Sequence, residues 1–511
     1  MRKLNVFPAA FLLISSLLAG CSASPASAQP QSASPSTQEY HEEVVIVGAG
    51  GAGLISGITA LEAGQDVLII EKMSFAGGAT LLSEGYIAGG GSTFQKEKGI
   101  DDDPETIYQD LMKGGKEKNQ EDLARLYAEN MGAAFNWLTD DLHVPFTEAS
   151  PLSYPEHTHD RVMVVDGGGS QYVQILKTKY EELGGRILYD TKAQELLTDA
   201  GKVIGIRAED KAGEEILLYA DAVLLATGGF GASPDLRPEG LEDVVFYGAV
   251  SSTGDGIKMA EKIGAQTLFM DTMKIYPQGL LNPQEKELTD EGALVRNGIS
   301  CAIGSKQTTN TTGSIYVNLE GSRFINENTD FVSIKEAQLL QPEKKMFLVM
   351  DQAGYDAWYA YTSTVLSTEL AEDWFQREGQ PIFIRAESLS SAAEQAGIDP
   401  VKLTETVQHF NEMAKKGNDS DFGRELTGGI EGDTYYIIEL KLRTATTLGG
   451  VKTNDAMQVL DTQNEVIPGL YAAGEIVGGA NGVESMPSCM NAWSLVSARK
   501  AASTILENLN H

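Results

Sequence analysis

Residues 43–71 read EVVIVGAGGAGLISGITALEAGQDVLIIE, and this stretch decides the fold. The β-branched run before Gly48 predicts a buried parallel strand, and LISGITALEAG predicts the helix that follows it. A second strand, DVLII, ends at Glu71. This order indicates a dinucleotide-binding unit, because such units place a strand, GxGxxG, a helix, a second strand and an acid within about 30 residues. We therefore predict an α/β fold with a Rossmann-like domain on a parallel sheet.

Each glycine of this motif has a physical task. Gly48 permits the tight turn that ends the first strand. Gly50, followed by Gly51, lets backbone N–H groups approach a pyrophosphate at the helix N-terminus, and Gly53 lets the helix pack on the strand. Glu71 is placed to accept hydrogen bonds from an adenosine ribose. NAD and FAD share this motif, so the rest of the chain must distinguish them.

Three further segments favour FAD. They are KMSFAGGAT (72–80), AVLLATGG (222–229) and GLYAAGE (469–475), and together they resemble flavoproteins with two dinucleotide-binding domains. In that group the last segment places an acid on the flavin ribityl chain, a role that falls to Glu475. No flavin-attachment motif is evident, so we predict non-covalent FAD. The predicted contacts are Gly48, Gly50, Gly51, Gly53, Glu71, Lys72, Gly78, Ala79, Thr80, Ala226, Thr227, Gly228, Asp255, Gly474 and Glu475.

The order of these motifs resembles the fumarate reductase and urocanate reductase flavoprotein family. STGDG (252–256), IYVNLEGSRFINE (315–327) and LGGV (448–451) complete the pattern, and ketosteroid dehydrogenases are more distant members. The resemblance implies an FAD-binding domain at 41–270 and 444–511. It also implies an inserted α+β clamp domain at 271–443 that closes over the substrate. The expected reaction is reduction of an activated C=C bond in a small unsaturated substrate, by hydride transfer from flavin N5.

The resemblance breaks at the positions that bind dicarboxylates in relatives. Tyr276 occupies the first of them and is our candidate for the substrate contact or the acid. The arginine that donates the proton in relatives is replaced by Phe331, and the other positions are also neutral. These tentative pocket residues are Phe331, Gln307, Asn310, Thr446 and Ser485. An unpaired carboxylate in a closed pocket costs several kcal/mol, so an uncharged or mostly apolar substrate is expected. The alternative is that another basic residue, such as Arg296 or Arg443, supplies the charge.

Two other functions stay open. One is a ketosteroid-type dehydrogenase working in the oxidative direction. The other is a flavin electron carrier without substrate turnover, which would not need a clamp domain. The sequence has no CxxCH for an attached haem and no CxxC for an iron–sulfur cluster. Electrons must therefore be exchanged with a separate membrane or extracellular electron-transfer protein.

The N-terminal segment has the features of an export signal. Residues 1–20 combine a basic start, a short apolar run and Leu-Ala-Gly, and Cys21 follows directly. This resembles a bacterial lipobox, in which the cysteine is acylated. Residues 21–40 are rich in Ser, Ala and Pro and predict a flexible linker. The expected location is the cell membrane, with the protein lipid-anchored at Cys21 on the extracytoplasmic side.

Composition excludes other classes. The 511 residues carry a net charge of -33, so nucleic-acid binding is not expected, because a phosphate backbone needs a basic surface. His157 and His159 lie on alternate positions with no evident third ligand, and no metal site is predicted. Cys301 and Cys489 would either pair or remain as buried thiols.

Overall fold

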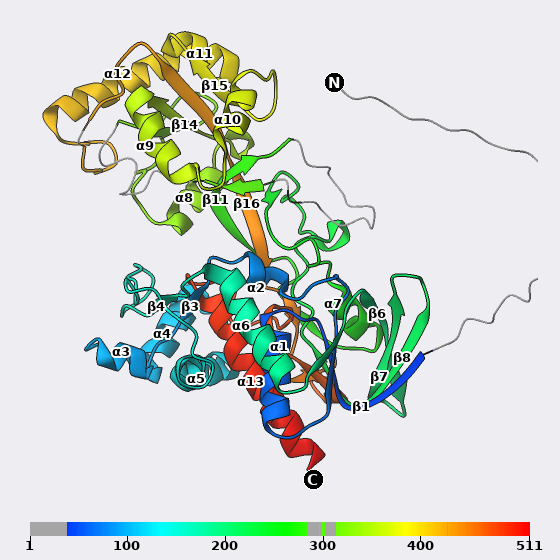
Figure 1. The fold of residues 1–511 in the computed structure, drawn as a ribbon. Coiled ribbons are helices and arrows are strands. Elements are labelled where there is room, and N and C mark those ends of the chain that lie inside the picture. Colours follow the sequence, from blue (N-terminus) through cyan, green and yellow to red (C-terminus); the bar gives the residue numbers. More distant parts are fainter. Residues whose placement is uncertain (1–37, 284–295, 297, 302–312, 427, 511) are drawn as a thin grey trace, which may run out of the picture. The chain divides into compact units, whose positions relative to one another are not determined.

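The structure is a computed structural model that describes residues 38–283, 296, 298–301, 313–426 and 428–510. Its described part is organised around two large sheets, and Figure 1 labels their principal strands and helices. The chain builds most of the first sheet, continues into the second, and then returns to complete the first.

The first sheet follows the order β18-β19-β8-β1-β2-β5, with β7 joined to β8 and β6 joined to β7. Strand β1 pairs in parallel with β2 and β8, which also pair in parallel with β5 and β19 respectively. The pairs β6–β7, β7–β8 and β18–β19 are antiparallel. The strands are β1 (Gln38–Val47), β2 (Val67–Ile70), β5 (Arg186–Leu188), β6 (Thr191–Asp199), β7 (Lys202–Asp210), β8 (Glu215–Leu225), β18 (Gln458–Leu460) and β19 (Val466–Ala472).

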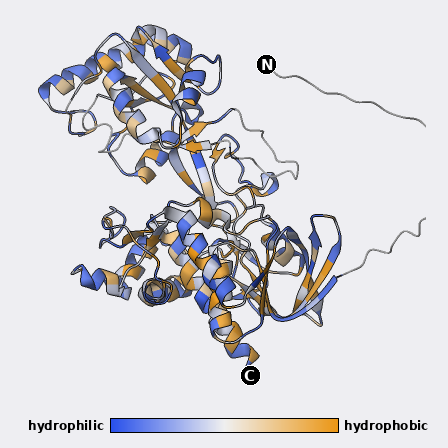
Figure 2. Ribbon diagram, in the orientation of Figure 1, coloured by the Kyte–Doolittle hydropathy of each residue, from blue (hydrophilic) through white to orange (hydrophobic). Residues whose placement is uncertain are grey.

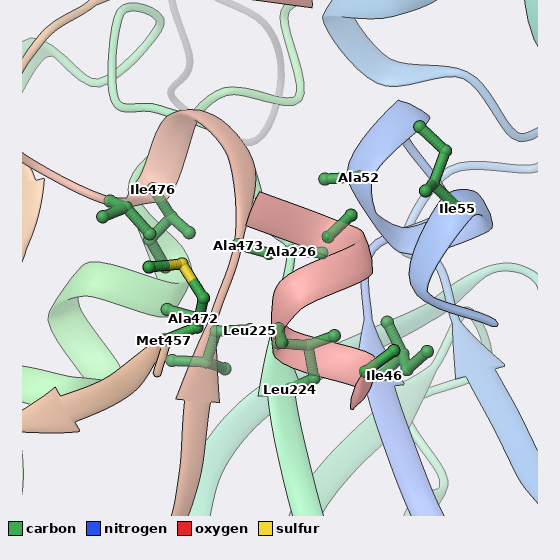
Figure 3. Close-up of a cluster of buried hydrophobic side chains, with 14 of the residues drawn as sticks. Ile46, Ala52, Ile55, Leu224, Leu225, Ala226, Met457, Ala472, Ala473 and Ile476 are labelled. Atoms are coloured by element: carbon green, nitrogen blue, oxygen red, sulfur yellow. The ribbon is translucent and has the colours of Figure 1, made fainter. Parts of the chain in front are cut away.

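The parallel strands are buried because apolar elements cover them. Val44–Val47 of β1 and all four residues of β2 are buried, as a parallel strand covered on both faces requires. Figure 3 shows Ile46 of β1 and Leu224 of β8 in the apolar cluster that also contains Ile55 and Ala472. This core fixes the strand ends from which the glycine-rich turns emerge.

Helices α1 (Gly51–Glu62) and α13 (Cys489–Leu509) pack against each other beside this sheet. Helix α6 (Gly168–Glu182) contacts α1, and α5 (Glu121–Asp140) contacts α13. Figure 2 shows hydrophobic and hydrophilic residues along the helices of this part, and α1 is buried over most of its length, as expected for a helix enclosed by other elements. Smaller helices of this part are α2 (Gly78–Leu82), α3 (Thr93–Glu97), α4 (Pro104–Gly114) and α7 (Asp255–Lys262).

The second sheet follows the order β12-β11-β16-β14-β13, and β9 and β15 also pair with β16. All its pairs are antiparallel except β16–β9. Its strands are β9 (Val245–Phe246), β11 (Met273–Leu281), β12 (Gly298–Ser300), β13 (Ile315–Val317), β14 (Met346–Asp351), β15 (Phe383–Ala386) and β16 (Tyr435–Thr447). Its helices are α8 (Phe331–Leu339), α9 (Gln352–Thr362), α10 (Thr368–Phe375), α11 (Leu389–Ala396) and α12 (Pro400–Lys416).

The predicted fold class is confirmed: the GxGxxG turn lies between β1 and β2 of a sheet whose central strands are parallel, and a mixed α/β segment is inserted in the chain. The domain limits at 270 and 443 stay a prediction. Four short strands complete the description: β3 (Tyr86–Ala88) pairs with β4 (Val162–Val164), and β10 (Thr267–Leu268) pairs with β17 (Gly450–Val451).

Candidate active site

The glycine turn between β1 and α1 has the geometry that its motif predicts. Gly48 has a φ of 104°, and a Cβ there would lie 2.5 Å from the Ala226 carbonyl oxygen. A Cβ on Gly53 would lie 1.9 Å from the Gly48 carbonyl oxygen, so strand and helix pack without room for a side chain. A Cβ on Gly50 would meet nothing closer than the Gly77 oxygen at 3.9 Å. The protein itself leaves space at Gly50, as expected where a ligand approaches the backbone.

Glu71 is held in place by the backbone at the end of β2. Its carboxylate accepts hydrogen bonds from the Ala49 N–H at 2.8 Å and the Met73 N–H at 2.9 Å. Burial raises the pKa of Glu71, and these backbone bonds oppose the rise. The acid is thus oriented beside the glycine turn, where the motif places the ribose of a dinucleotide.

A first cavity lies over this turn, and its lining residues come from segments that are far apart in the chain. The hydroxyl of Thr227 is buried in its wall without a hydrogen-bond partner, which leaves a polar group available to a ligand. Predicted contacts that line the cavity are Gly48, Gly50, Gly51, Glu71, Lys72, Gly78, Ala79, Thr80, Ala226, Thr227, Gly228, Asp255 and Glu475.

Gly53 and Gly474 do not line this cavity. Gly53 packs on Gly48, and a Cβ on Gly474 would lie 2.8 Å from the Ala52 Cβ. Both glycines therefore allow close packing of the segments that carry the cavity wall. The sequence interpretation missed the segment from Thr191 to Ala193, which also lines the cavity. It follows β5, a strand of only three residues whose pattern gave no signal.

Lys72 and Asp255 form an ion pair at the rim of the first cavity. The Lys72 Nζ lies 2.7 Å from an Asp255 oxygen and also donates to the Thr253 hydroxyl. Burial alone would raise the pKa of Asp255, but Lys72 and Thr253 hold it below its usual value. The pair joins the end of β2 to the start of α7, two parts of the wall that are far apart in sequence.

Glu475 lies where the first cavity meets a second one. Its Oε1 accepts hydrogen bonds from the Thr447 N–H at 2.8 Å and the Thr447 hydroxyl at 3.1 Å. Burial raises the pKa of Glu475 to about 7. Ala79, Thr80, Glu475 and Ser494 line both cavities, so a molecule in the first cavity borders the space of the second.

The second cavity has a volume of about 620 Å³, and its wall combines aromatic, polar and charged side chains. Tyr276 of β11 and Phe331, the first residue of α8, meet edge to face with ring centroids 6.1 Å apart. The other aromatic lining residues are Tyr86, Tyr154, Tyr247 and Tyr361. Such a wall suits a planar apolar group, because aromatic rings pack by stacking and edge contacts.

The predicted pocket residues are largely brought together here. Tyr276, Phe331, Thr446 and Ser485 all line the second cavity, whereas Gln307 and Asn310 lie outside the described residues. Burial raises the pKa of Tyr276 to about 12, and nearby Arg443 opposes this rise. The phenol therefore keeps its proton at neutral pH.

The cavity also contains positive charge. Arg443 of β16 and Lys274 of β11 line it, whereas Arg296 is exposed and does not. Lys274 donates to Glu484 and, at 2.6 Å, to the Ser485 carbonyl oxygen, and Glu484 also pairs with Lys335 of α8. Lys274 was missed in the sequence, although it stands two residues from Tyr276 and thus on the same face of a strand.

Of the remaining candidates, Cys301 lines the second cavity, whereas His157 and Cys489 line neither cavity. The His157 Nε2 lies 3.0 Å from the Pro487 carbonyl oxygen, and burial lowers the pKa of His157 to about 4. In the described part no three His, Cys, Asp or Glu side chains come together as metal ligands. Cys301 and Cys489 are both free, buried thiols. No helix among the described residues is long and apolar enough to cross a bilayer.

A dinucleotide cavity that shares wall residues with a second cavity suits a flavin-dependent oxidoreductase, and comparison with known proteins shows that class. The family model for the FAD binding domain matches residues 43–490. Urocanate reductase from Eggerthella lenta is 35% identical over 456 residues, which span 88% of this chain and 72% of that protein. The chain therefore belongs to the FAD-binding family that the sequence motifs indicated.

Two solved structures have the same fold as this chain. The open conformation of a flavocytochrome c3 fumarate reductase matches with a TM-score of 0.73 and 25% identity, covering 92% of this chain and 78% of that one. The 3-ketosteroid-delta4-(5alpha)-dehydrogenase from Rhodococcus jostii matches with a TM-score of 0.69 and 26% identity, covering 94% and 99%. The predicted resemblance, FAD as cofactor and the oxidoreductase class are confirmed.

Proposed function

We propose that this enzyme reduces an activated C=C bond in a planar, mostly apolar substrate. The observation that carries the proposal is the aromatic cavity, which shares four wall residues with the dinucleotide cavity and contains the phenol of Tyr276. Relatives that act on unsaturated acids support this reaction class. When bound and reduced, the flavin supplies a hydride.

The first cavity is where we place FAD. Gly50 and Gly51 would face its pyrophosphate, Glu71 its ribose and Glu475 the chain that leads to the flavin ring. Thr227 offers an unpartnered hydroxyl, and Lys72 is a cation at the rim. These groups match the polar parts of FAD. We therefore propose that FAD is bound without a covalent link to the protein.

The residues of the second cavity would bind and orient the substrate and supply a proton. Phe331 and the tyrosine rings enclose the reacting carbons and displace water, which favours hydride transfer. The Tyr276 hydroxyl holds a proton for the α-carbon. Glu156 is a second acid in the wall, and burial raises its pKa. Phe331, Thr446 and Ser485 offer no charge, so a dicarboxylate would lack its usual arginine and histidine partners.

A second candidate is oxidation of a saturated ketone in the manner of a ketosteroid dehydrogenase. The aromatic residues of the wall favour it, because a flat polycyclic ketone would find the same stacking surfaces. An electron carrier without turnover would have no use for a cavity of about 620 Å³ beside the dinucleotide site. The structure thus favours an enzyme over a carrier.

Anaerobic assays distinguish these functions. Reduced viologen with a panel of unsaturated ketones and acids tests reduction, and an artificial electron acceptor with saturated ketones tests oxidation. We expect turnover in the first assay well above the rate of free FAD. Turnover in the second assay alone would support the dehydrogenase, and turnover in neither would support the carrier.

We also propose that Cys21 carries a lipid and holds the enzyme on the extracytoplasmic face of the cell membrane. The LAGC sequence and the linker that follows it support this proposal. A separate membrane or extracellular electron-transfer protein would then reduce the enzyme. Fractionation of cells that express wild type and Cys21→Ser tests it: the wild type should be found in the membrane fraction and the variant should not. Equal distribution would contradict the anchor.

A further inference from the structure

Gln278 is a buried amide in the wall of the second cavity. It lies on β11 two residues after Tyr276, and both side chains line the cavity. Gln278 is only 4% exposed, and its side-chain oxygen Oε1 has no hydrogen-bond partner among the described residues. Its backbone oxygen differs, because it accepts from the Cys301 N–H at 3.2 Å. The side chain therefore keeps an acceptor that the described part of the protein does not use.

A buried acceptor without a donor needs an explanation. Taking a polar group out of water without a new hydrogen bond costs about 1–3 kcal/mol, and an apolar side chain would fill the same space without this cost. Gln65, Gln266 and Gln338 also have a buried Oε1 without a partner in the described part, but they line neither cavity. Gln278 is therefore better explained as a contact for a ligand than as part of the core.

Gln278 belongs to the part of the second cavity that does not border the dinucleotide site. It lines only the second cavity, and Ser300 and Cys301 line the wall beside it because β12 pairs with β11. Gln278 follows Tyr276 by two residues, which corresponds to about 6–7 Å along a strand. A substrate that reacts beside Tyr276 would therefore reach Gln278 with its far end, with room for a flat ring between the two.

The wall restricts the group that Gln278 can bind. An amide oxygen accepts hydrogen bonds and needs an O–H or N–H donor. Arg443, which pairs opposite Tyr276, lines the same cavity, and its positive charge disfavours a cationic donor such as an ammonium group. The Arg443 Nε is also buried without a partner among the described residues, and a hydroxyl group, which accepts as well as donates, can serve both atoms. We infer that Gln278 binds a neutral hydroxyl group at the end of the substrate that lies away from the dinucleotide site.

This inference rests on the proposed function and adds a specificity-determining residue to it. A substrate with the hydroxyl gains the hydrogen bond to Gln278, whereas one without it leaves Oε1 buried and unpaired. Such a site discriminates more strongly than an apolar pocket, because the wrong substrate also bears the cost of the unpaired group. The C=C bond stays beside Tyr276 in both cases, so Gln278 acts on binding rather than on hydride transfer.

The test compares two neutral probes of nearly equal size. The hydroxyl probe is 4-(4-hydroxyphenyl)but-3-en-2-one, and the fluoro probe is 4-(4-fluorophenyl)but-3-en-2-one, which cannot donate a hydrogen bond. Calorimetry measures the binding of each probe to the oxidised holoenzyme, and anaerobic assays with reduced viologen measure kcat and KM. Wild type, Gln278→Met and Gln266→Leu are compared.

Gln278→Met keeps the length of the side chain and removes its amide oxygen. Gln266→Leu is the matched control, because Gln266 also has an unpartnered Oε1 in the described part but lies outside both cavities. FAD content and thermal denaturation show whether each variant is folded. The comparison of the two probes on wild type needs no variant, so a folding defect in Gln278→Met would not remove the test.

We expect wild type to bind the hydroxyl probe about 10- to 100-fold more tightly than the fluoro probe, the difference expected for one buried hydrogen bond. In Gln278→Met this preference should fall below about threefold, mainly through a higher KM for the hydroxyl probe. The kcat should change little with either probe. Gln266→Leu should keep the wild-type preference.

Equal binding of the two probes by wild type would overturn the inference, and so would a preference that persists in Gln278→Met. Turnover of both probes with equal KM would keep the proposed reduction and reject the hydroxyl site. Tight, Gln278-dependent binding of the hydroxyl probe without turnover of any unsaturated probe would keep the hydroxyl site and reject the proposed reduction.

Discussion

Gly53 lies against Gly48 so closely that a Cβ on Gly53 would be 1.9 Å from the Gly48 carbonyl oxygen. Gly53→Ala therefore forces helix α1 away from β1, and overpacking of this kind costs about 1–3 kcal/mol. Gly50→Ala is the matched control, because the protein leaves 3.9 Å there. We expect Gly50→Ala to denature like wild type without FAD but to bind FAD at least about tenfold more weakly.

The measurements are thermal denaturation of FAD-free protein and titration with FAD followed by flavin fluorescence. If Gly50→Ala binds FAD like wild type, the pyrophosphate does not approach this turn. If Gly53→Ala denatures like wild type, the strand and the helix can separate without cost.

The pKa of Glu475 predicts a pH dependence of stability. Its usual value is 4.5, and burial raises it to about 7 in the folded protein. Below a pH of about 4.5 the Glu475 carboxyl is protonated in both the folded and the unfolded protein, so its burial carries no charge penalty. As the pH rises through about 7, the buried carboxyl must ionise, and the folded protein loses stability. The FAD-free wild type should therefore lose stability relative to Glu475→Gln between pH 5 and pH 8, by on the order of a few degrees in Tm. Glu465→Gln, at an exposed site, should show no such trend.

Tyr276 is expected to donate the proton to the α-carbon. Tyr276→Phe removes the hydroxyl but keeps the ring, so kcat should fall by about 10²–10⁴ while substrate affinity changes little. Glu156→Gln is made in parallel, since Glu156 is another acid of the wall whose pKa burial raises. Single-turnover oxidation of the reduced enzyme by substrate is the measurement. A large loss in Glu156→Gln with full activity in Tyr276→Phe would assign the proton to Glu156.

The uncharged side chain of Phe331, at the position of an arginine in relatives, leads us to expect that fumarate is a poor ligand. One carboxylate of fumarate would meet Arg443, but Phe331, Thr446 and Ser485 offer no charge to the other, and Glu484 already neutralises Lys274. Each missing charge-assisted hydrogen bond is worth about 1.5–3 kcal/mol, so binding should be weaker than in fumarate reductases by orders of magnitude. Phe331→Arg alone should not restore turnover, because Thr446 and Ser485 still cannot hold the second carboxylate. Brisk reduction of fumarate by wild type would contradict this assignment of the pocket.

Arg161 is expected to be a major contributor to stability. It is fully buried, and its Nε and Nη1 donate to Asp102 at 2.9 Å and to Asp110 at 2.7 Å. Arg161→Met leaves two buried carboxylates unpaired and should lower the free energy of unfolding by about 3–5 kcal/mol. Chemical denaturation measures the loss. Adding Asp102→Asn to Arg161→Met should recover part of it, and no recovery would mean that the arginine acts through packing alone.

The nucleotide-binding half could be predicted from sequence because its signals are local. Gly48 needs a positive φ, Gly53 needs close packing, and Glu71 must follow a strand, so residue type and spacing specify each task. The same holds for Glu475, whose short segment ends a parallel strand. These residues converge because the carboxyl ends of parallel strands meet at one edge of the sheet.

The sequence alone therefore determined the α/β class and the dinucleotide turn, and it predicts that the dicarboxylate-binding residues of relatives are replaced. It could not choose between Arg296 and Arg443, because no spacing rule links either side chain to a cavity. The tertiary structure decided that point: β11, β9 and β16 come from distant parts of the chain, and their pairing sets Arg443 between Tyr276 and Tyr247. Long-range strand register determines which side chains share a pocket, and a local pattern does not record it.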